Sequence, residues 1–187
     1  MLSSTNAIVL NHKKFSDTSL ICNLYSKDYG KFSIIAKGGS LKNPHGSILE
    51  PLNHIDLIYY YKQKRNIQLF KEASIIKKHY HISENYKKMI YALTMGDIIN
   101  FSSYNESPCN IIFRLITKSL EWIDKADSKF LDYYYVFFII QLLIYLGYHP
   151  ALEKCSHCNQ KITSASFHSQ IGQLLCMKCS KQKAILN

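Results

Sequence analysis

The amino-acid sequence predicts an α+β protein, with an N-terminal five-stranded barrel followed by a three-helix bundle and a small C-terminal cysteine module. Three observations support this. Apolar residues alternate over the first 80 residues, a helical period begins near residue 83, and four cysteines follow the pattern C-x2-C-x17-C-x2-C. A chain of 187 residues that is 47% hydrophobic has ample material for a core.

Alternation of apolar and polar residues predicts the five strands. The alternating positions are Ile8 and Leu10; Leu20, Cys22 and Leu24; Phe32, Ile34 and Ala36; Ile55, Leu57, Tyr59 and Tyr61; and Ile67 and Leu69. Turn residues separate these runs, including a long Gly- and Pro-containing segment at 38–46. Five short strands fit a small closed barrel, and the OB-fold is the commonest of these. We therefore expect residues 1–80 to form an OB-fold nucleic-acid-binding domain.

Three helices are predicted after the barrel. The first spans 83–101, with Ser83 as its N-cap and with Ile90, Leu93, Met95 and Ile98 among its buried positions. Ser107 and Pro108 are a cap and a first helical proline, opening a second helix that runs to about residue 123. The third spans 130–146 and ends at Gly147. Residues 81–187 are expected to form one helical domain that carries the cysteine module at 152–182.

The spacing of Cys155, Cys158, Cys176 and Cys179 predicts a zinc site. Two residues between paired cysteines let one tight turn direct both sulfurs at the same ion. Four protein ligands leave no open position, so the Zn2+ would be structural and would take no part in chemistry. A disulfide framework or a redox motif is the less favoured reading, and a ligand role for His157 is less favoured than a solvent-facing position. Cys22 and Cys109 lie in apolar surroundings and are expected in the core.

The formal net charge of +10 argues for a polyanionic partner. Residues 1–80 have a net charge of +7, residues 81–150 of −1 and residues 151–187 of +4. A codon bias toward lysine would spread the charge evenly. The uneven distribution therefore favours a binding surface in the first and last segments.

The predicted barrel combines basic and aromatic residues. The basic candidates for DNA binding are Lys31, Lys37, Lys42, Lys62, Lys64 and Arg65, and the aromatic residues among them are Tyr29, Phe32, Tyr59, Tyr60, Tyr61 and Phe70. Cations neutralise phosphates, and aromatic faces stack on unpaired bases, a combination that suits sequence-independent binding of single strands. The alternative is that Tyr59 and Tyr61 belong to the barrel core and that the lysines are solvated surface.

The sequence shows no catalytic motif, so we expect no enzymatic activity. Gly30-Lys31 lacks the rest of a phosphate-binding loop, and neither G-x-S-x-G nor H-E-x-x-H occurs. His79 and His81 are expected as exposed residues at a strand end. The apolar run 133–148 is too short to span a membrane and no targeting peptide is evident, so a cytoplasmic location is expected.

Several motifs together resemble the RecO family of bacterial recombination mediators. They are F-S-D-T-S-L at 15–20, Tyr29-Gly30-Lys31, Ala36-Lys37-Gly38, L-E-P-L at 49–52, L-L-I-Y-L-G-Y-H-P-A-L at 142–152 running into Cys155, and Phe167 followed by G-Q-L-L-C at 172–176. The stretch 146–158 is the most specific, because Gly-Tyr-x-Pro-x-Leu-x-x-Cys directly precedes the first cysteine pair.

The resemblance implies a protein that binds single- and double-stranded DNA and anneals complementary strands. It implies RecR as a partner, and the loading of RecA onto DNA coated by single-strand-binding protein, without nucleotide hydrolysis. Lys37 matches the lysine of the family's Lys-Gly turn, and Lys42 matches a basic position after it; both are implicated in DNA contact.

The chain departs from the family pattern at two places. Gly39-Ser40 follows Lys37-Gly38 where the family usually has arginine. Typical members also continue in helices beyond the second cysteine pair, so the chain is expected to be a short form in which the site for single-strand-binding protein is incomplete. The alternative hypothesis is an adaptor that binds RecR or single-strand-binding protein and has little affinity for DNA.

Overall fold

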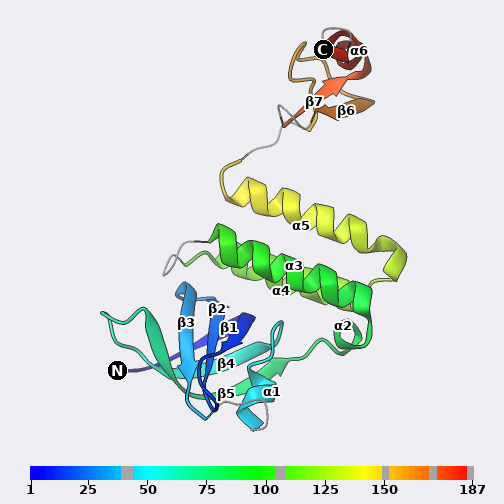
Figure 1. Ribbon diagram of the computed structural model, residues 1–187. Coiled ribbons are helices and arrows are strands. Elements are labelled where there is room, and N and C mark those ends of the chain that lie inside the picture. The colour runs from blue at the N-terminus through cyan, green and yellow to red at the C-terminus, as the bar shows by residue number, and fades with distance from the viewer. Residues whose placement is uncertain (39–43, 104–107, 149–151, 169–171, 185–187) are drawn as a thin grey trace. The chain divides into compact units, whose positions relative to one another are not determined.

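The computed structural model describes residues 1–38, 44–103, 108–148, 152–168 and 172–184 (Figure 1). Packing divides the chain into two compact units, Met1–Gln141 and Leu142–Asn187. The first holds the strands β1–β5 and most of the helices, and the second holds the cysteine module. The two units are described separately.

Five strands form a closed barrel in the order β1-β2-β3-β5-β4. They are β1 (Leu2–Lys14), β2 (Leu20–Ser26), β3 (Gly30–Ala36), β4 (His54–Tyr60) and β5 (Ile67–Lys77). All neighbours pair antiparallel except β3 and β5, which run parallel over three residue pairs. The predicted five-stranded N-terminal sheet is confirmed, and its strand order is that of an OB-like fold.

Strand β1 is long enough to pair on both sides. Its first half, Leu2 to Ile8, pairs with β4, and its second half, Ala7 to Lys14, pairs with β2. The register with β2 shifts between Val9 and Asn11, and an irregularity of this kind bends a strand and increases its twist. One curved strand therefore joins the two halves of the sheet and helps to close it.

The barrel core follows from the alternation seen in the sequence. Phe32, Ile34 and Ala36 of β3 are buried, and their neighbours on the strand are only partly buried. Cys22, Leu57 and Tyr59 join them in one cluster. Burial raises the pKa of the Cys22 thiol to about 12, so this cysteine behaves as a small apolar residue, as expected.

Three elements differ from the expected strand pattern. β1 begins at Leu2, well before the first alternating residue, Ile8, and β5 extends beyond Leu69 to Lys77. The segment expected as one long turn contains a short helix, α1 (Pro44–Ile48). Gly46 of this helix is buried, which is possible because glycine adds no side chain to the packing.

The helices that follow are α2 (Tyr80–Glu84), α3 (Tyr86–Ser102), α4 (Asn110–Lys125), a 3-10 turn at Ser128–Phe130, and α5 (Leu131–Tyr145), which begins in the first unit and ends in the second. Ser83 is not the N-cap of the long helix, because it lies inside α2, where its hydroxyl donates to the carbonyl of Tyr80. Asn85 is the cap instead, since its side chain accepts a hydrogen bond from the backbone N–H of Lys88. Cys109 occupies the N-cap position of α4 but makes no side-chain capping bond. Pro108 precedes the helix and is not its first residue, and the predicted cap Ser107 lies outside the described residues.

Helix α3 packs on the barrel through its small residues. Ala92, Met95, Gly96 and Ile99 are buried, whereas Ile90 is exposed and Leu93 and Ile98 are half-buried. Of the predicted positions, only Met95 is therefore fully buried. A Cβ atom on Gly96 would lie 3.6 Å from the carbonyl oxygen of Leu10, so the helix backbone approaches β1 closely at this glycine.

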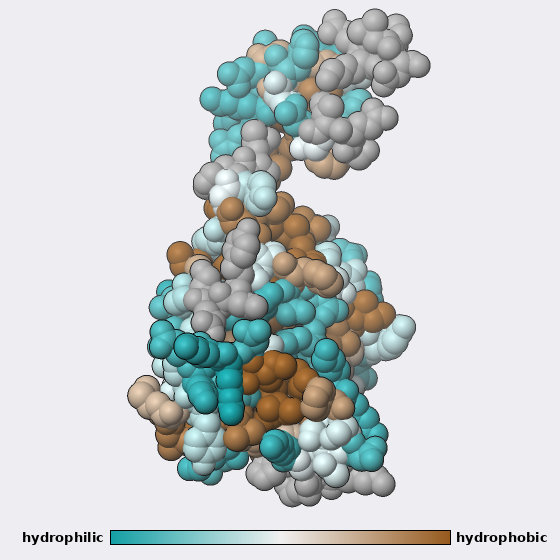
Figure 2. Space-filling view, turned by 60° about the vertical axis from the view of Figure 1, so that its left-hand side comes forward, coloured by the Kyte–Doolittle hydropathy of each residue, from teal (hydrophilic) through white to brown (hydrophobic). Residues whose placement is uncertain are grey.

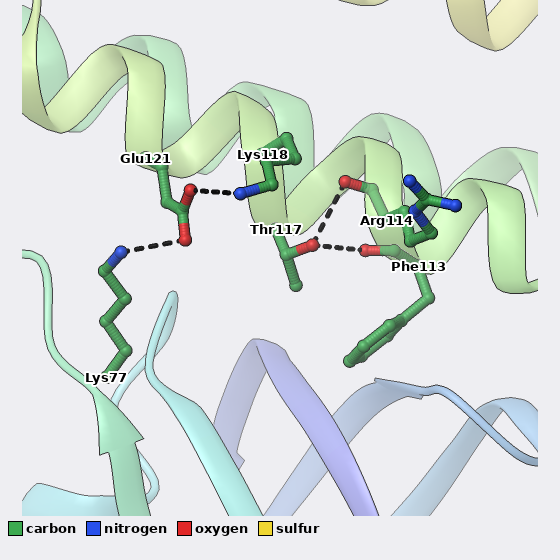
Figure 3. Close-up of polar contacts among 6 residues, drawn as sticks. All are labelled: Lys77, Phe113, Arg114, Thr117, Lys118 and Glu121. Atoms are coloured by element: carbon green, nitrogen blue, oxygen red, sulfur yellow. Dashed lines mark hydrogen bonds and ion pairs between the residues drawn. The ribbon is translucent and has the colours of Figure 1, made fainter.

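Helix α4 is tied to strand β5 by an ionic cluster (Figure 3). Glu121 lies 2.8 Å from the ammonium group of Lys77 and 2.9 Å from that of Lys118. These two ammonium groups lower the pKa of Glu121 to about 2. The ring of Phe113, which points from α4 toward the barrel, meets the ring of His54 edge-on at 5.7 Å. The barrel and the helices of the first unit therefore share polar and aromatic contacts.

Aromatic side chains of α5 meet α3 and α4. The Trp122 ring stacks near Tyr134 at 6.3 Å and meets Phe137 at 5.6 Å. The Tyr91 hydroxyl donates to the carboxylate of Asp132. Among the described residues, none of the helices is long and apolar enough to cross a membrane.

Helix α5 ends in a glycine cap, and a hairpin and a short helix follow it. Gly147 has φ +89°. The backbone N–H groups of Gly147 and Tyr148 donate to the carbonyls of Ile144 and Leu143, so the helix ends with the predicted glycine C-cap. Beyond it, β6 (Ala165–His168) and β7 (Gln173–Cys176) form an antiparallel hairpin that leads into α6 (Met177–Ala184).

Candidate nucleic-acid interface and cysteine cluster

The β4–β5 loop, residues 61–66, presents three exposed cations: Lys62, Lys64 and Arg65. Its shape is set by Gln68, which is buried. The Gln68 side-chain oxygen accepts from the backbone N–H of Lys62, and its amide donates to the carbonyls of Lys62 and Arg65. Because one buried amide makes three bonds to its backbone, the loop holds the three cations on a fixed frame.

None of these three cations has an ion-pair partner within the part of the chain that the structure describes. By contrast, Lys71, Lys77 and Lys78 on β5 and just after it each contact a glutamate. In Figure 2, hydrophilic side chains border an apolar area on the barrel. The β4–β5 loop is therefore a surface with uncompensated positive charge.

The structure divides the five predicted basic residues that it describes between two ends of the barrel. Ile67 of β5 pairs with Ser33 of β3 in parallel, so the β4–β5 loop lies at the end where β3 begins, near Lys31. Lys37 follows the other end of β3 and is exposed. Six steps along the extended chain separate Lys31 from Lys37, a distance of about 20 Å. Lys42 lies outside the described residues.

Lys31 is only partly available, because its ammonium group donates to the carbonyl of Asn100 at the end of α3, 2.6 Å away. Sequence reasoning missed this contact, since it joins residues far apart in the chain. The opposite end of the barrel also has two cations that the sequence analysis did not select. Lys13 and Lys14, exposed at the end of β1, precede the exposed Phe15 of the β1–β2 loop. The sequence Lys13-Lys14-Phe15, directly before a turn, is the pattern from which these two cations could have been predicted as candidates.

The aromatic candidates separate into core and surface residues. Phe32 and Tyr59 are buried in the barrel, Tyr61 and Phe70 pack on its margin, and Tyr29 and Tyr60 are exposed. For Tyr59 the core interpretation is confirmed. Tyr29 and Tyr61 border a cavity beside the β4–β5 loop.

The four cysteine sulfurs of the second unit come together as predicted. Cys155, Cys158, Cys176 and Cys179 have Sγ atoms that all lie within 4.8 Å of one another. The sulfurs of Cys158 and Cys176 are 3.8 Å apart. A tetrahedral Zn2+ with Zn–S bonds of about 2.3 Å requires sulfurs about 3.8 Å apart, so the donor set fits this ion.

Backbone N–H groups point at the sulfurs in this cluster. The N–H groups of Cys158 and Cys176 stabilise the thiolate of Cys155 and lower its pKa to about 6. The N–H of Cys179 likewise lowers the pKa of Cys176. The neighbouring sulfurs of Cys176 and Cys158, together with burial, raise the pKa of Cys179 to about 12. Four thiols in contact cannot all ionise unless a cation compensates their charge, which is the condition that a bound metal supplies.

Hydrogen bonds fix the first cysteine turn onto the hairpin. The backbone N–H of Ser156 and its hydroxyl both donate to the carbonyl of Leu174, and Asn159, at φ +58°, closes the turn. His157 is exposed, with its Nδ1 atom 3.7 Å from the Cys179 sulfur. Over the residues that the structure describes, these four cysteines are the only group of three or more His, Cys, Asp or Glu side chains arranged to hold a metal.

The protein is an α+β protein in which a closed OB-like barrel with a basic loop is followed by helices and a four-cysteine cluster. Comparison with known families identifies the family to which the chain belongs. The family model "Recombination protein O N terminal" matches residues 1–79, and "Recombination protein O C terminal" matches residues 83–184. The chain therefore belongs to the RecO family, which confirms the resemblance seen in the sequence.

Relatives in this family carry the name "DNA repair protein RecO". The protein from Chlorobaculum parvum is 30% identical over 176 residues, which cover 94% of this chain and 67% of the relative. The protein from Thermodesulfovibrio yellowstonii is 29% identical over 178 residues, which cover 95% of this chain and 70% of the relative. The protein from Salinibacter ruber is 24% identical over 151 residues, which cover 80% of this chain and 58% of the relative. The chain thus spans about two thirds of the length of its first two relatives and belongs to a family of DNA repair proteins.

Proposed function

We propose that this protein is a DNA-binding recombination mediator that binds single- and double-stranded DNA, anneals complementary strands and helps to load RecA during repair. The observation that carries the proposal is the β4–β5 loop. Lys62, Lys64 and Arg65 are exposed there on a frame that buried Gln68 fixes, without acidic partners among the described residues. Such cations bind phosphates and release counterions whatever the base sequence.

Binding to both strand types follows from a contact set dominated by phosphate. Cations on a loop reach the backbone of a duplex or of a single strand, and they do not need base edges. Annealing requires no covalent step, so the proposed activity is not enzymatic. Action on the bacterial chromosome implies a cytoplasmic location.

The four-cysteine cluster is proposed to hold a structural Zn2+ through Cys155, Cys158, Cys176 and Cys179. The 3.8 Å separation of the Cys158 and Cys176 sulfurs and the N–H groups directed at Cys155 support this assignment. When bound, zinc would fix the two cysteine turns to one point and would leave no position for a substrate. The last residue of β7 is Cys176, and Cys179 lies in the first turn of α6, so the strand–helix junction presents the second pair of ligands.

The protein partners that fit this role are RecR, single-strand-binding protein and, indirectly, RecA. They are proposed from the family to which the chain belongs. A second candidate function is an adaptor that binds RecR or single-strand-binding protein and has little affinity for DNA. The exposed aromatic residues of the helical part favour it, with Phe101 88% exposed and Tyr133 71% exposed.

A salt titration of DNA affinity tests the proposal. We expect the logarithm of the single-strand association constant to fall linearly with the logarithm of salt concentration, as measured by fluorescence anisotropy. Replacement of Lys62, Lys64 and Arg65 by alanine should reduce the slope by about 2, since each lost contact to a single strand removes about 0.7. Duplex affinity should also fall, because the lost contacts are to phosphates.

The matched control replaces Lys87, Lys125 and Lys129, three exposed lysines on and near the helices, and makes the same change in net charge. If both triple variants lose the same slope, only the total charge matters and the β4–β5 loop is not the site. A wild-type protein that ignores DNA at low salt but captures purified RecR would support the adaptor function instead.

A further inference from the structure

A small aromatic cavity opens beside the β4–β5 loop. Its volume is about 260 Å3, and its lining includes Asp28, Tyr29, Tyr59, Tyr61 and the rim residue Pro108. Pockets for drug-sized ligands measure roughly 300–1,000 Å3, so this cavity suits a single flat ring system. Neither the cysteine cluster nor the phosphate contacts proposed above use it.

The walls of the cavity are aromatic faces. The rings of Tyr29 and Tyr61 are nearly parallel, with an interplanar angle of 20° and centroids 6.5 Å apart. Tyr59 lies behind them, edge-on to Tyr29 at 6.2 Å and 5.1 Å from Phe32. Because Tyr29 and Tyr61 already share an orientation, a planar ligand can stack against them without reorienting their rings.

One side of the cavity carries a fixed hydrogen-bond acceptor. Asp28 lies in the β2–β3 turn, and its Oδ2 atom accepts a hydrogen bond from the Thr5 hydroxyl at 2.7 Å. Among the hydrogen bonds of the described residues, the bond from Thr5 is the one that the Asp28 side chain accepts. Ser26 holds the turn, since its hydroxyl oxygen accepts from the backbone N–H of Tyr29 at 3.0 Å. An acceptor in a fixed position therefore faces an apolar slot.

Polar groups converge at the floor of the same cavity. Burial raises the pKa of the Tyr59 hydroxyl, and the nearby hydroxyls of Tyr29 and Tyr61 and the carboxylate of Asp28 raise it further. Both amide hydrogens of Gln68 are used in holding the loop, so this side chain offers no further donor to a ligand. Apart from the tyrosine hydroxyls, the group that can recognise a ligand here is the carboxylate of Asp28, the one charged side chain among the described residues of the lining.

We propose that this cavity binds one unpaired nucleobase, which stacks on Tyr29 and Tyr61 and donates its exocyclic amino group to Asp28. This inference rests on the proposed DNA binding and adds base selection to it. A carboxylate accepts from the exocyclic amino group that cytosine, adenine and guanine carry, whereas thymine has no amino group and presents carbonyl oxygens that the carboxylate repels. The cavity therefore favours cytosine and adenine over thymine.

The charges around the cavity distinguish a nucleotide from a cationic protein side chain. An aromatic cage with one carboxylate is also a suitable site for lysine or arginine. However, Lys62, Lys64 and Arg65 project from the loop next to the cavity, and they repel a cation while they attract the phosphate attached to a base. A nucleotide fits both features, because its base can stack in the aromatic cavity while its phosphate contacts the cations of the β4–β5 loop.

Homopolymer affinities test the inference. The full chain, loaded with zinc, should bind oligo-dC and oligo-dA about fivefold or more tightly than oligo-dT of the same length in fluorescence anisotropy. The isosteric variant Asp28→Asn presents an amide N–H to the base and should reduce or reverse this preference. Because asparagine can keep the Thr5 bond, the variant should retain the wild-type melting temperature.

Aromatic variants test the stacking surface. Tyr29→Ala should weaken single-strand binding by about fivefold or more and leave duplex affinity almost unchanged, because paired bases are not free to enter the cavity. Tyr60→Ala is the matched control, since Tyr60 is exposed on the same strand as Tyr59 but projects to the opposite side. Photo-cross-linking with 5-iododeoxycytidine should map to Tyr29 or Tyr61 by mass spectrometry.

The possible results separate the two proposals. Binding to single strands with a normal salt slope but equal affinity for dC, dA and dT, unchanged in Asp28→Asn, would overturn the base site and leave the DNA-binding function standing. Cross-links confined to residues outside the cavity would also overturn the base site. So would a lysine-rich peptide that binds in the cavity and that no oligonucleotide displaces. Absence of any salt-dependent DNA binding would overturn both.

Discussion

His79 shows how burial of one side chain couples stability to pH. It was expected to be exposed but is buried at the start of α2, close to Asp124, Lys77, Glu121 and His54. Its Nδ1 atom has no hydrogen-bond partner among the described residues. Burial lowers the pKa of His79, and it lowers that of His54 likewise.

We expect the unfolding free energy of the first unit to fall as the pH drops below about 6.5. In that range the unfolded chain takes up protons that the buried neutral imidazoles of the folded state do not. The stability is therefore complete above the unfolded-state pKa and is lost toward the lower folded-state pKa. Urea unfolding at pH 7.5 and 5.5, followed by fluorescence of the single tryptophan, Trp122, measures it in this unit alone.

His79→Phe should remove part of this pH dependence. The exposed His81→Gln is the control and should keep it. A wild-type unfolding free energy that is equal at the two pH values would contradict the expectation, and so would a His79→Phe profile that matches the wild type.

Gly96 offers a second test at the scale of one residue. The Cβ of an alanine would lie 3.6 Å from the Leu10 carbonyl oxygen and 3.8 Å from Leu52 Cδ2, which are ordinary contact distances. Glycine inside a helix costs about 0.5–1 kcal/mol relative to alanine. Gly96→Ala should therefore raise the unfolding free energy by about that amount, as measured by urea titration.

The larger variant Gly96→Leu should change the sign of the effect. Extra side-chain atoms between α3 and β1 would force the two apart, at a cost of about 1–3 kcal/mol. If Gly96→Leu were as stable as Gly96→Ala, the close approach of α3 to the barrel would not limit side-chain size at this position.

Some residue positions could be predicted from the sequence because their causes are local. Gly147 ends α5 with φ +89° because a left-handed C-cap favours glycine wherever it occurs. Ser83 was a plausible cap by type. Asn85 takes that place because α2 occupies 80–84, and the contact of the Ile82 N–H with Asp124 that helps to hold α2 spans distant parts of the chain.

At the scale of elements, the cysteine turns were predictable and the helix faces were not. A C-x2-C pair fixes its sulfurs within one turn, so spacing alone brings two ligands together. The buried face of α3 depends on what covers it. The barrel selects Ala92 and Gly96 at the contact and leaves the larger Ile90 exposed, which a pattern of apolar residues does not reveal.

The DNA-binding residues illustrate the same division. The exposure of Lys62, Lys64 and Arg65 follows from a polar loop between two strands. The bond from Lys31 to the Asn100 carbonyl and the separation of Lys37 from the loop by a whole strand require the three-dimensional fold. The contact between the rings of Tyr29 and Tyr61 could not be predicted from the sequence either.

At the scale of the whole molecule, two separately packed units predict two separable responses to metal loss. Zinc ligation of this kind contributes on the order of 10 kcal/mol to folding at neutral pH. Chelation, or Cys155→Ser, should therefore unfold the second unit, in which limited proteolysis would then cleave. The Trp122 unfolding transition and most of the DNA affinity should remain, because Trp122 and the β4–β5 loop belong to the first unit.

Cys22→Ser is a useful comparison, since Cys22 lies in the barrel core and outside the metal cluster. It should lower the stability of the first unit and leave the metal content, measured by atomic absorption, unchanged. Loss of the Trp122 transition on chelation would show instead that the two units depend on each other for folding.

The seam between β3 and β5 has a consequence for the order of folding. Only three residue pairs, from Ser33 with Ile67 to Ile35 with Leu69, close the barrel there, whereas β2 and β3 are joined by seven pairs across a tight turn. Hairpins between neighbouring strands form quickly, and parallel pairs that need a long intervening chain form slowly. The barrel therefore assembles as a curled sheet first and closes last at this seam, which is also where the least free energy is needed to open it.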